Sequence, residues 1–208
     1  MTDSATVRSE LEAALLAYDR ATTVSLARRR LEDGTVDLGG LYDLLSDVLI
    51  EVGSSWQTGE TEVWQEHLVT GIVRSVVEAC AVSVEAAAPS RPTRTVLLAA
   101  PEEEYHDLGL RMLADRFTLA GWHAHFLGAN VPAAEVIAAV DALDADAVAL
   151  AASTHLHRLC LREYVARITA THPNLRVWVG GSAFAHDHGG WPQEAVLDPH
   201  HLPPAGAG

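Results

Sequence analysis

The sequence predicts an α/β protein in which a four-helix bundle precedes a parallel sheet. In the first part of the chain, apolar residues recur at helical spacing without strand alternation. In the second part, short apolar runs alternate with helical patterns, which favours a parallel sheet with right-handed crossovers. A Pro-rich break at residues 86–93 separates the two parts. We therefore expect two domains, 1–88 and 93–208.

Composition limits the classes of function. The chain has 208 residues, of which 49% are hydrophobic and 20% charged, as in a globular protein. Its net charge is −14 and it contains Arg but no Lys, which argues against direct nucleic-acid binding, Schiff-base chemistry and a Walker-type phosphate loop. We expect no signal peptide and no membrane-spanning run. The two cysteines are interpreted as reduced thiols, and we expect a cytoplasmic protein.

Helical periodicity predicts four helices in the first domain. The first runs through residues 11–18 and the second through 24–31, where an Asp-Gly pair ends it. Asp37 caps a third helix, which ends near Trp56, and the fourth begins at Thr61. Because the breaks between them are short, the helices are expected to form an up-and-down bundle.

The end of the third helix carries residues that a plain bundle does not require. Trp56 is followed by nine residues and then by Glu66 and His67. One interpretation is that Trp56 fills the bundle core while the other two side chains are solvated. The alternative is that all three face a ligand, and the residues alone leave both open.

Four strands and three helices are predicted in the second domain. The strands are 95–100, 122–127, 146–151 and 176–180, and the helices are 110–120, 133–143 and 157–171. The segment from residue 189 onward predicts at most one short element, and residues 205–208 are expected to be disordered. The His-rich run 186–201 is not expected to form a metal site, because nothing fixes its geometry.

Each strand of the second domain is followed by a distinctive loop. The loop residues are His106 after the first strand, Asn130 after the second, Ser153, Thr154 and His155 after the third, and Gly180 and Gly181 after the fourth. All would meet at the carboxyl edge of the sheet, where open α/β sheets bind ligands. An isolated histidine in such a loop is most often an ordinary surface residue, but the ordered set of loop residues predicts a binding site.

These loops together resemble the cobalamin-binding domain. Its pattern is Asp-x-His-x-x-Gly, then Ser-x-Leu, then Gly-Gly; here Glu104, His106 and Gly109 fit with Glu in place of Asp, and His155 replaces the usual Leu. The resemblance covers roughly residues 5 to 185. It implies a Rossmann-like (flavodoxin-like) cobalamin-binding domain, with the helical bundle over the upper face of the corrin.

Within that family the chain is most similar to the light-sensing cobalamin domains of the CarH repressors. Those domains use Glu-x-His in the ligand loop and a Trp, nine residues, Glu-His motif in the bundle, which Trp56, Glu66 and His67 match. Two features depart from the repressors. Their N-terminal DNA-binding domain is not expected here, and the cobalt-capturing histidine that follows their Trp is replaced by Gln57.

The resemblance implies a set of cofactor-binding residues. His106 would be the metal ligand below the cobalt, Glu104 and Ser153 would orient it, and small residues would admit the nucleotide tail of the cofactor. Trp56, Glu66 and His67 would cover an adenosyl group. The full set is Trp56, Glu66, His67, Glu104, His106, Gly109, Ser153, His155, Gly180 and Gly181.

The function implied by the resemblance is an adenosylcobalamin-dependent light sensor that is not an enzyme. Breaking the cobalt–carbon bond would change its conformation or its state as a homo-oligomer and signal to an unknown output protein, without direct contact with nucleic acid or membrane. One alternative is a corrinoid methyl-carrier protein for a methyltransferase, against which the Glu-x-His and Trp-to-Glu-His motifs argue. Another is a photocobilin that also binds biliverdin, with Trp64, His155 and His157 near the second tetrapyrrole.

Overall fold

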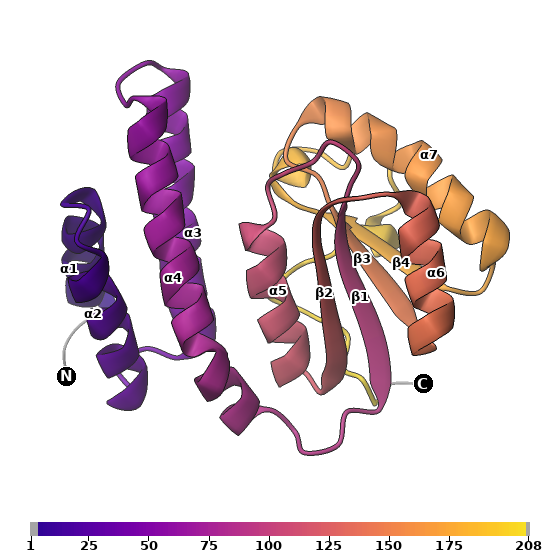
Figure 1. Cartoon of the computed structure of the whole chain (residues 1–208), viewed down its shortest axis with the longest axis horizontal. Helices are drawn as coiled ribbons and strands as arrows, with labels where there is room; N and C mark the ends of the chain where they lie inside the picture. The colour runs from indigo at the N-terminus through magenta and orange to yellow at the C-terminus, as the bar shows by residue number, and fades with distance from the viewer. Residues whose placement is uncertain (1–3, 207–208) are drawn as a thin grey trace. The chain divides into compact units, whose positions relative to one another are not determined.

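The computed structural model describes residues 4–206, with side chains from residue 6. The chain divides into two compact units, one up to Ala86 and one from Ala87 onward (Figure 1). Each unit is described by itself.

The helical unit contains the four predicted helices. They are α1 (Ser4–Leu16), α2 (Arg20–Glu32), α3 (Leu38–Gln57) and α4 (Val63–Ala87). Side-chain caps fix the start of two of them: Asp19 accepts from Thr22 N at 3.0 Å in α2, and Asp37 accepts from Gly40 N at 2.7 Å in α3. Such caps satisfy backbone N–H groups that have no partner within a first helical turn. The predicted cap at Asp37 is therefore confirmed.

Apolar side chains from all four helices form the core of this unit. The largest fully buried ones include Leu11, Leu15, Leu41, Tyr42 and Leu45, and α4 adds Val73, Val76 and Val77. Burying each such side chain stabilises the fold by about 1.5–3 kcal/mol. Among residues 4–206, one helix, α4, is long and apolar enough to cross a membrane by length and composition, contrary to our expectation. In this unit, 39% of its most apolar stretch is buried.

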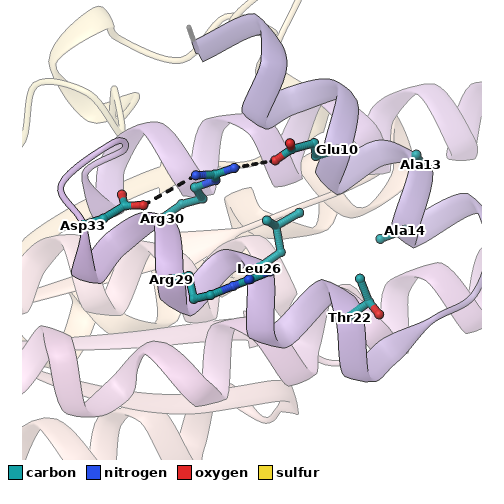
Figure 2. Close-up of a pocket in the computed structure, with 8 residues that line it drawn as sticks. All are labelled: Glu10, Ala13, Ala14, Thr22, Leu26, Arg29, Arg30 and Asp33. Carbon is teal, nitrogen blue, oxygen red and sulfur yellow. Dashed lines mark hydrogen bonds and ion pairs between the residues drawn. The ribbon is translucent and has the colours of Figure 1, made fainter. Parts of the chain in front are cut away.

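A hollow of about 760 Å³ lies between α1 and α2 (Figure 2). Arg30 crosses it, and its guanidinium lies 2.7 Å from the Glu10 carboxylate and 3.5 Å from that of Asp33. Ala13, Ala14, Thr22, Leu26 and Arg29 complete the lining. None of the residues predicted to bind a cofactor lines this hollow, so it carries no part of the candidate site.

The second unit is a parallel sheet covered on both faces, which confirms the predicted fold class. Its elements are β1 (Arg94–Pro101), α5 (Leu108–Leu119), β2 (Trp122–Val131), α6 (Ala133–Leu143), β3 (Ala147–Ala151), α7 (His155–Thr171), β4 (Arg176–Gly180) and two short 3-10 helices, Ser182–Phe184 and Gln193–Ala195. The strand order is β2-β1-β3-β4, and every neighbouring pair is parallel.

Alternate residues of β1 enter two different hydrophobic cores. Leu97 and Ala99 pack with α6 and α7 on one face, while Val96 and Leu98 pack with α5 on the other (Figure 1). A parallel strand buried on both faces is therefore a continuous apolar run, as this one is.

The C-terminal segment differs from its predicted disorder. The Trp122 indole donates to Pro203 O at 2.7 Å, and Ala205 is buried among the α5-side core residues. Val196 forms a parallel bridge with Val179 at the outer side of β4. The segment is thus held against the sheet as far as Ala205. Residues 207–208 lie outside the described part of the chain.

Two element boundaries differ from the prediction in ways that matter for the site. β2 continues to Val131, so Asn130 lies within the end of the strand, with a left-handed φ of 54°. α7 begins at His155 instead of His157, because the Thr154 hydroxyl accepts from His157 N at 3.2 Å and caps the helix. This cap places His157 in the first turn of α7.

Candidate functional site

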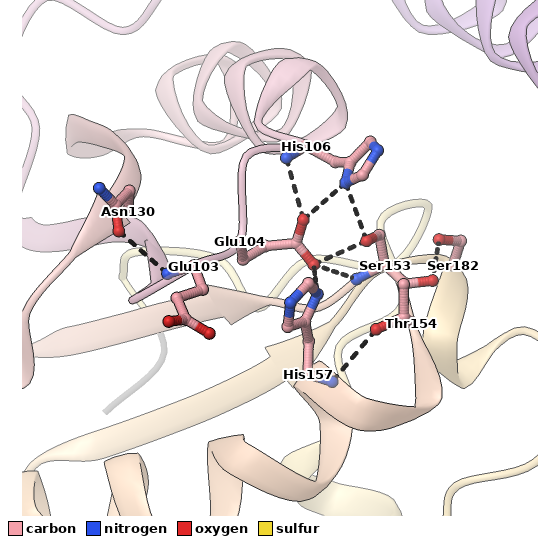
Figure 3. A network of polar contacts seen from close by, with 8 residues as sticks. All are labelled: Glu103, Glu104, His106, Asn130, Ser153, Thr154, His157 and Ser182. Carbon is pink, nitrogen blue, oxygen red and sulfur yellow. Dashed lines mark hydrogen bonds and ion pairs between the residues drawn. The ribbon is translucent and has the colours of Figure 1, made fainter.

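The residues predicted to bind a ligand on the sheet meet where the strand order reverses. β1 lies between β2 and β3, and the loops that follow β1 and β3 leave the same edge of the sheet. Glu104 and His106 come from the first loop and Ser153 from the second (Figure 3). Such a switch point is the usual ligand-binding position of an open α/β sheet.

Glu104 is the centre of a polar network. Its side chain is fully buried. Oε1 accepts from His106 N at 3.0 Å and from His106 Nδ1 at 2.7 Å, and Oε2 accepts from Ser153 N and Ser153 Oγ, each at 2.7 Å. Burial raises the pKa of this carboxyl, but the hydrogen bonds from Ser153 and His106 outweigh burial and lower the pKa to about 2. Glu104 is therefore an ionised, buried acceptor.

Asn130 holds the loop that carries this carboxylate. Its backbone N–H donates to Glu104 O at 2.9 Å, and its side-chain oxygen accepts from Glu103 N at 2.9 Å. Glu103 adopts a left-handed φ of 67°, which few residues without special support adopt. The end of β2 thus fixes the turn that directs Glu104 inward.

The network determines the tautomer of His106. A carboxylate can only accept hydrogen bonds, so the contact with Glu104 requires a proton on Nδ1. Ser153 Oγ lies 3.0 Å from the same Nδ1 and is a second acceptor for it. The side chain is 74% exposed, and Figure 3 shows the other ring nitrogen directed away from the network. In the neutral ring, Nε2 keeps a lone pair that can bind a metal, with the carboxylate fixing the ring behind it.

His155 lies outside this network. Its Nδ1 is 3.0 Å from Nη2 of the buried Arg158 side chain. Nη1 of the same guanidinium donates to Ala183 O and to Asp187 O, each at 2.8 Å. A guanidinium can only donate, so Nδ1 of His155 accepts and the neutral ring carries its proton on Nε2. This ring therefore has no lone pair to offer a metal.

The three glycines predicted to bind the cofactor differ in the space around them. A Cβ at Gly109, in the first turn of α5, would meet no atom within 4 Å. At Gly181, with φ of 98°, a Cβ would lie 2.4 Å from Ala152 O, so the chain itself requires glycine there. At Gly180 the nearest atom, Leu197 O, would lie at an ordinary 3.7 Å. Of the three glycines, Gly109 alone therefore faces open space.

In the helical unit, two of the three predicted residues, Trp56 and His67, are exposed, and Glu66 is partly buried. Trp56, in the last turn of α3, is 47% exposed, so it does not fill the core of this unit. Glu66 accepts from Thr70 Oγ1 at 2.7 Å and contacts His67 Nδ1, while the His67 side chain is 74% exposed. Trp64 packs against Tyr18, with ring centroids 5.8 Å apart.

Sequence reasoning did not identify His157 as a partner of Glu104. Its Nδ1 lies 2.6 Å from Glu104 Oε2 (Figure 3). The signal that could have identified it is the capping residue Thr154, which places the third residue of α7 beside the loop after β1.

Known proteins agree with this architecture. A family model described as B12 binding domain matches residues 94–193, and a second model with the same description matches residues 7–81. The chain is a cobalamin-binding domain protein. It is 34% identical over 179 residues to the HTH-type transcriptional repressor CarH of Myxococcus xanthus, an alignment that covers 86% of this chain and 58% of the repressor. The chain thus spans less than two thirds of that relative.

A solved structure shows the same fold. The monomethylamine corrinoid protein of Methanosarcina barkeri superposes with a TM-score of 0.74 at 18% identity, over 94% of this chain and 92% of that one. At this identity the likeness concerns the fold alone.

The donor set of the sheet site fits cobalamin. The described part of the chain contains no cluster of three or more His, Cys, Asp and Glu side chains that could hold a metal ion. A bare ion needs several protein ligands, whereas the corrin ring supplies four nitrogens and leaves only axial positions for the protein. One exposed imidazole nitrogen, that of His106, backed by a buried carboxylate is suited to such an axial position.

Proposed function

We propose that this protein is an adenosylcobalamin-dependent light sensor that acts by changing its conformation or self-association, and that it is not an enzyme. The observation that carries the proposal is the His106 ring, whose Nδ1 is bound by buried Glu104 while its outer face is exposed. The 34% identity to the CarH repressor supports a sensor over other cobalamin-binding classes. When bound, adenosylcobalamin supplies a cobalt–carbon bond that visible light breaks.

The residues of the sheet unit would bind and orient the cofactor. His106 would bind the cobalt through Nε2, with Glu104 accepting the proton of the opposite ring nitrogen. Ser153 anchors that carboxylate through both its backbone and its hydroxyl. The space beside Gly109 would admit the displaced nucleotide tail.

The helical unit would supply the light-dependent change. Trp56 exposes a large flat ring at the end of α3, and Glu66 has an acceptor close to the surface of α4. Covering an adenosyl group would bury both, and loss of that group on illumination would expose them again. A switch requires two states whose populations a chemical event changes, and loss of the adenosyl group would be such an event. The net charge of −14 favours output through a protein partner or a second copy over nucleic acid.

The proposal is tested with purified protein reconstituted with adenosylcobalamin. Absorption spectra before and after green light follow the bond, and size-exclusion chromatography with light scattering follows mass and compactness. We expect a change in size that accompanies the spectral change. The same size in the dark and after complete photolysis would contradict a switch in the protein itself. Repeating the spectra with biliverdin added tests the photocobilin alternative.

A corrinoid methyl carrier is the competing class. Its upper face must open to a methyltransferase, so a carrier would retain methylcobalamin as well as adenosylcobalamin and would show no light-dependent change in size. Comparing the affinities for the two cobalamins therefore separates the classes. The support for a carrier is a likeness of fold, at 18% identity.

A further inference from the structure

A second imidazole approaches the carboxylate that holds His106. His157 Nδ1 lies 2.6 Å from Glu104 Oε2, at ion-pair distance, and the His157 side chain is only 18% exposed. Its Nδ1 is buried and forms no aligned hydrogen bond with any group of the described chain. Glu104 therefore has one imidazole on each side, and only His106 is exposed (Figure 3).

The fold gives His157 little freedom. The Thr154 side chain accepts from His157 N at 3.2 Å, and Thr154 directly follows Ser153, whose N–H and hydroxyl bind the same Glu104 oxygen. The loop after β3 and the first turn of α7 thus place both a serine and a histidine beside Glu104 Oε2. A carboxylate is attracted to Nδ1 only when that nitrogen carries a proton, so the contact defines one state of the His157 ring.

We propose that His157 is a positioning residue for Glu104 and, through it, for His106; this inference rests on the proposed function. Ser153 donates hydrogen bonds to Oε2 from one direction, and His157 Nδ1 approaches it at 2.6 Å from another. Without His157, Oε2 is held by Ser153 alone, and the carboxylate that accepts the proton of His106 Nδ1 is less firmly fixed. Partners of this kind fix the tautomer and ring orientation of a metal-binding histidine.

The first test uses the protein without cobalamin. Long-range ¹H–¹⁵N NMR spectra report the tautomer of His106, and we expect the Nδ1–H form to dominate in the wild type. His157→Leu should give a mixture of tautomers. His157→Asn should restore the wild-type form, because its amide lies near the position of Nδ1, whereas His157→Gln carries its amide farther out and should not. An unchanged His106 tautomer in both the Leu and Gln variants would overturn the proposal.

The second test uses cobalamin binding. His157→Leu should weaken affinity about tenfold, the low end of the range for partners of a metal-binding histidine. It should also broaden or shift the axial nitrogen splitting in the electron paramagnetic resonance spectrum of the Co(II) form, and His157→Asn should match the wild type. Equal effects of Leu and Asn would overturn the positioning role.

His172→Leu is the matched control. His172 caps the other end of α7, its Nε2 is buried without a hydrogen bond, and that atom lies 3.6 Å from Asp141 Oδ1. The control variant should keep wild-type affinity and spectrum; if it matches His157→Leu, loss of a buried ring explains both results and the proposal fails. If the wild-type protein binds no cobalamin, the proposed function fails, while the NMR test still decides the role of His157.

Discussion

His106 in the sheet unit and His67 in the helical unit differ in the carboxylate behind them. Both side chains are 74% exposed, and both have Nδ1 against a glutamate. The partner of His106 is fully buried and is bound from two separate loops, whereas Glu66 is 24% exposed and adjacent to His67 in one helix. The sheet unit thus fixes its histidine before any ligand arrives, while the helical unit keeps a local pair that can rearrange.

Because of this difference, Glu104 and Glu66 should contribute unequally to the free energy of unfolding. Removing one partner of a buried, hydrogen-bonded charge leaves donors without acceptors and costs several kcal/mol, whereas an exposed pair contributes about 0–1 kcal/mol. The comparison therefore predicts which substitutions damage the fold and which change only binding.

The largest expected effect is that of Glu104→Ala. Ser153 N and His106 N would lose a fully buried acceptor in a part-buried position, so the free energy of unfolding should fall by about 3 kcal/mol. Glu66→Ala, the matched change in the helical unit, should cost less than about 1 kcal/mol. Urea denaturation followed by circular dichroism measures both. Equal losses would show that the two histidine–glutamate pairs are held in the same way.

The pH dependence of stability isolates the Glu104 charge. Its pKa of about 2 lies below the ordinary value of 4.5, so its contribution is present above pH 4.5 and is lost as the pH falls toward 2. The difference corresponds to about 3 kcal/mol. Wild-type protein should lose more stability between pH 6 and pH 3 than Glu104→Gln, which has no charge to lose. Parallel curves for the two proteins would contradict a depressed pKa at this position.

His106→Ala should separate binding from stability. Because the ring is exposed and Glu104 keeps its bonds from Ser153 and from the backbone N–H of residue 106, the free energy of unfolding should change by no more than about 1 kcal/mol. Cobalamin affinity should fall by about 100-fold, since loss of the ligand exceeds the loss of a partner behind it. Titration followed by absorption measures affinity, and the nitrogen splitting of the Co(II) form reports the axial ligand. A wild-type splitting in the variant would identify another residue as the ligand.

Much of this architecture could be predicted because local signals were strong. The apolar run of β1 and the Asp37 cap each specify their element without reference to the rest of the chain. The position of His106 followed from its place after a strand. The β2 end was misjudged because Gly128 and Asn130, with φ of 88° and 54°, usually mark a turn, yet strand pairing with β1 continues past them.

The site was harder to predict where contacts join distant segments. The contact between His157 and Glu104 depends on the capping residue Thr154, which shifts the start of α7 by two residues. The C-terminal segment is held by Trp122, whose indole donates to the carbonyl of Pro203. The two residues are 81 positions apart in the sequence. The polar, Pro-rich composition of the C-terminal segment does not indicate that a tryptophan elsewhere in the chain binds it.

The smallest expected effect concerns the axial position of the proposed cofactor that lies opposite His106, after illumination. An amide is a poor cobalt ligand beside imidazole, so Gln57 should leave that position accessible to added imidazole, which absorption spectra detect. Gln57→His should abolish the response to imidazole by supplying a ring of its own. If illuminated wild-type protein already resists imidazole, a histidine of the chain occupies the position. His67→Ala should then restore the response, because His67 Nδ1 faces Glu66 and the His67 side chain is 74% exposed. His155→Ala should not, because Arg158 binds His155 Nδ1 and leaves the proton on the nitrogen that would have to bind cobalt.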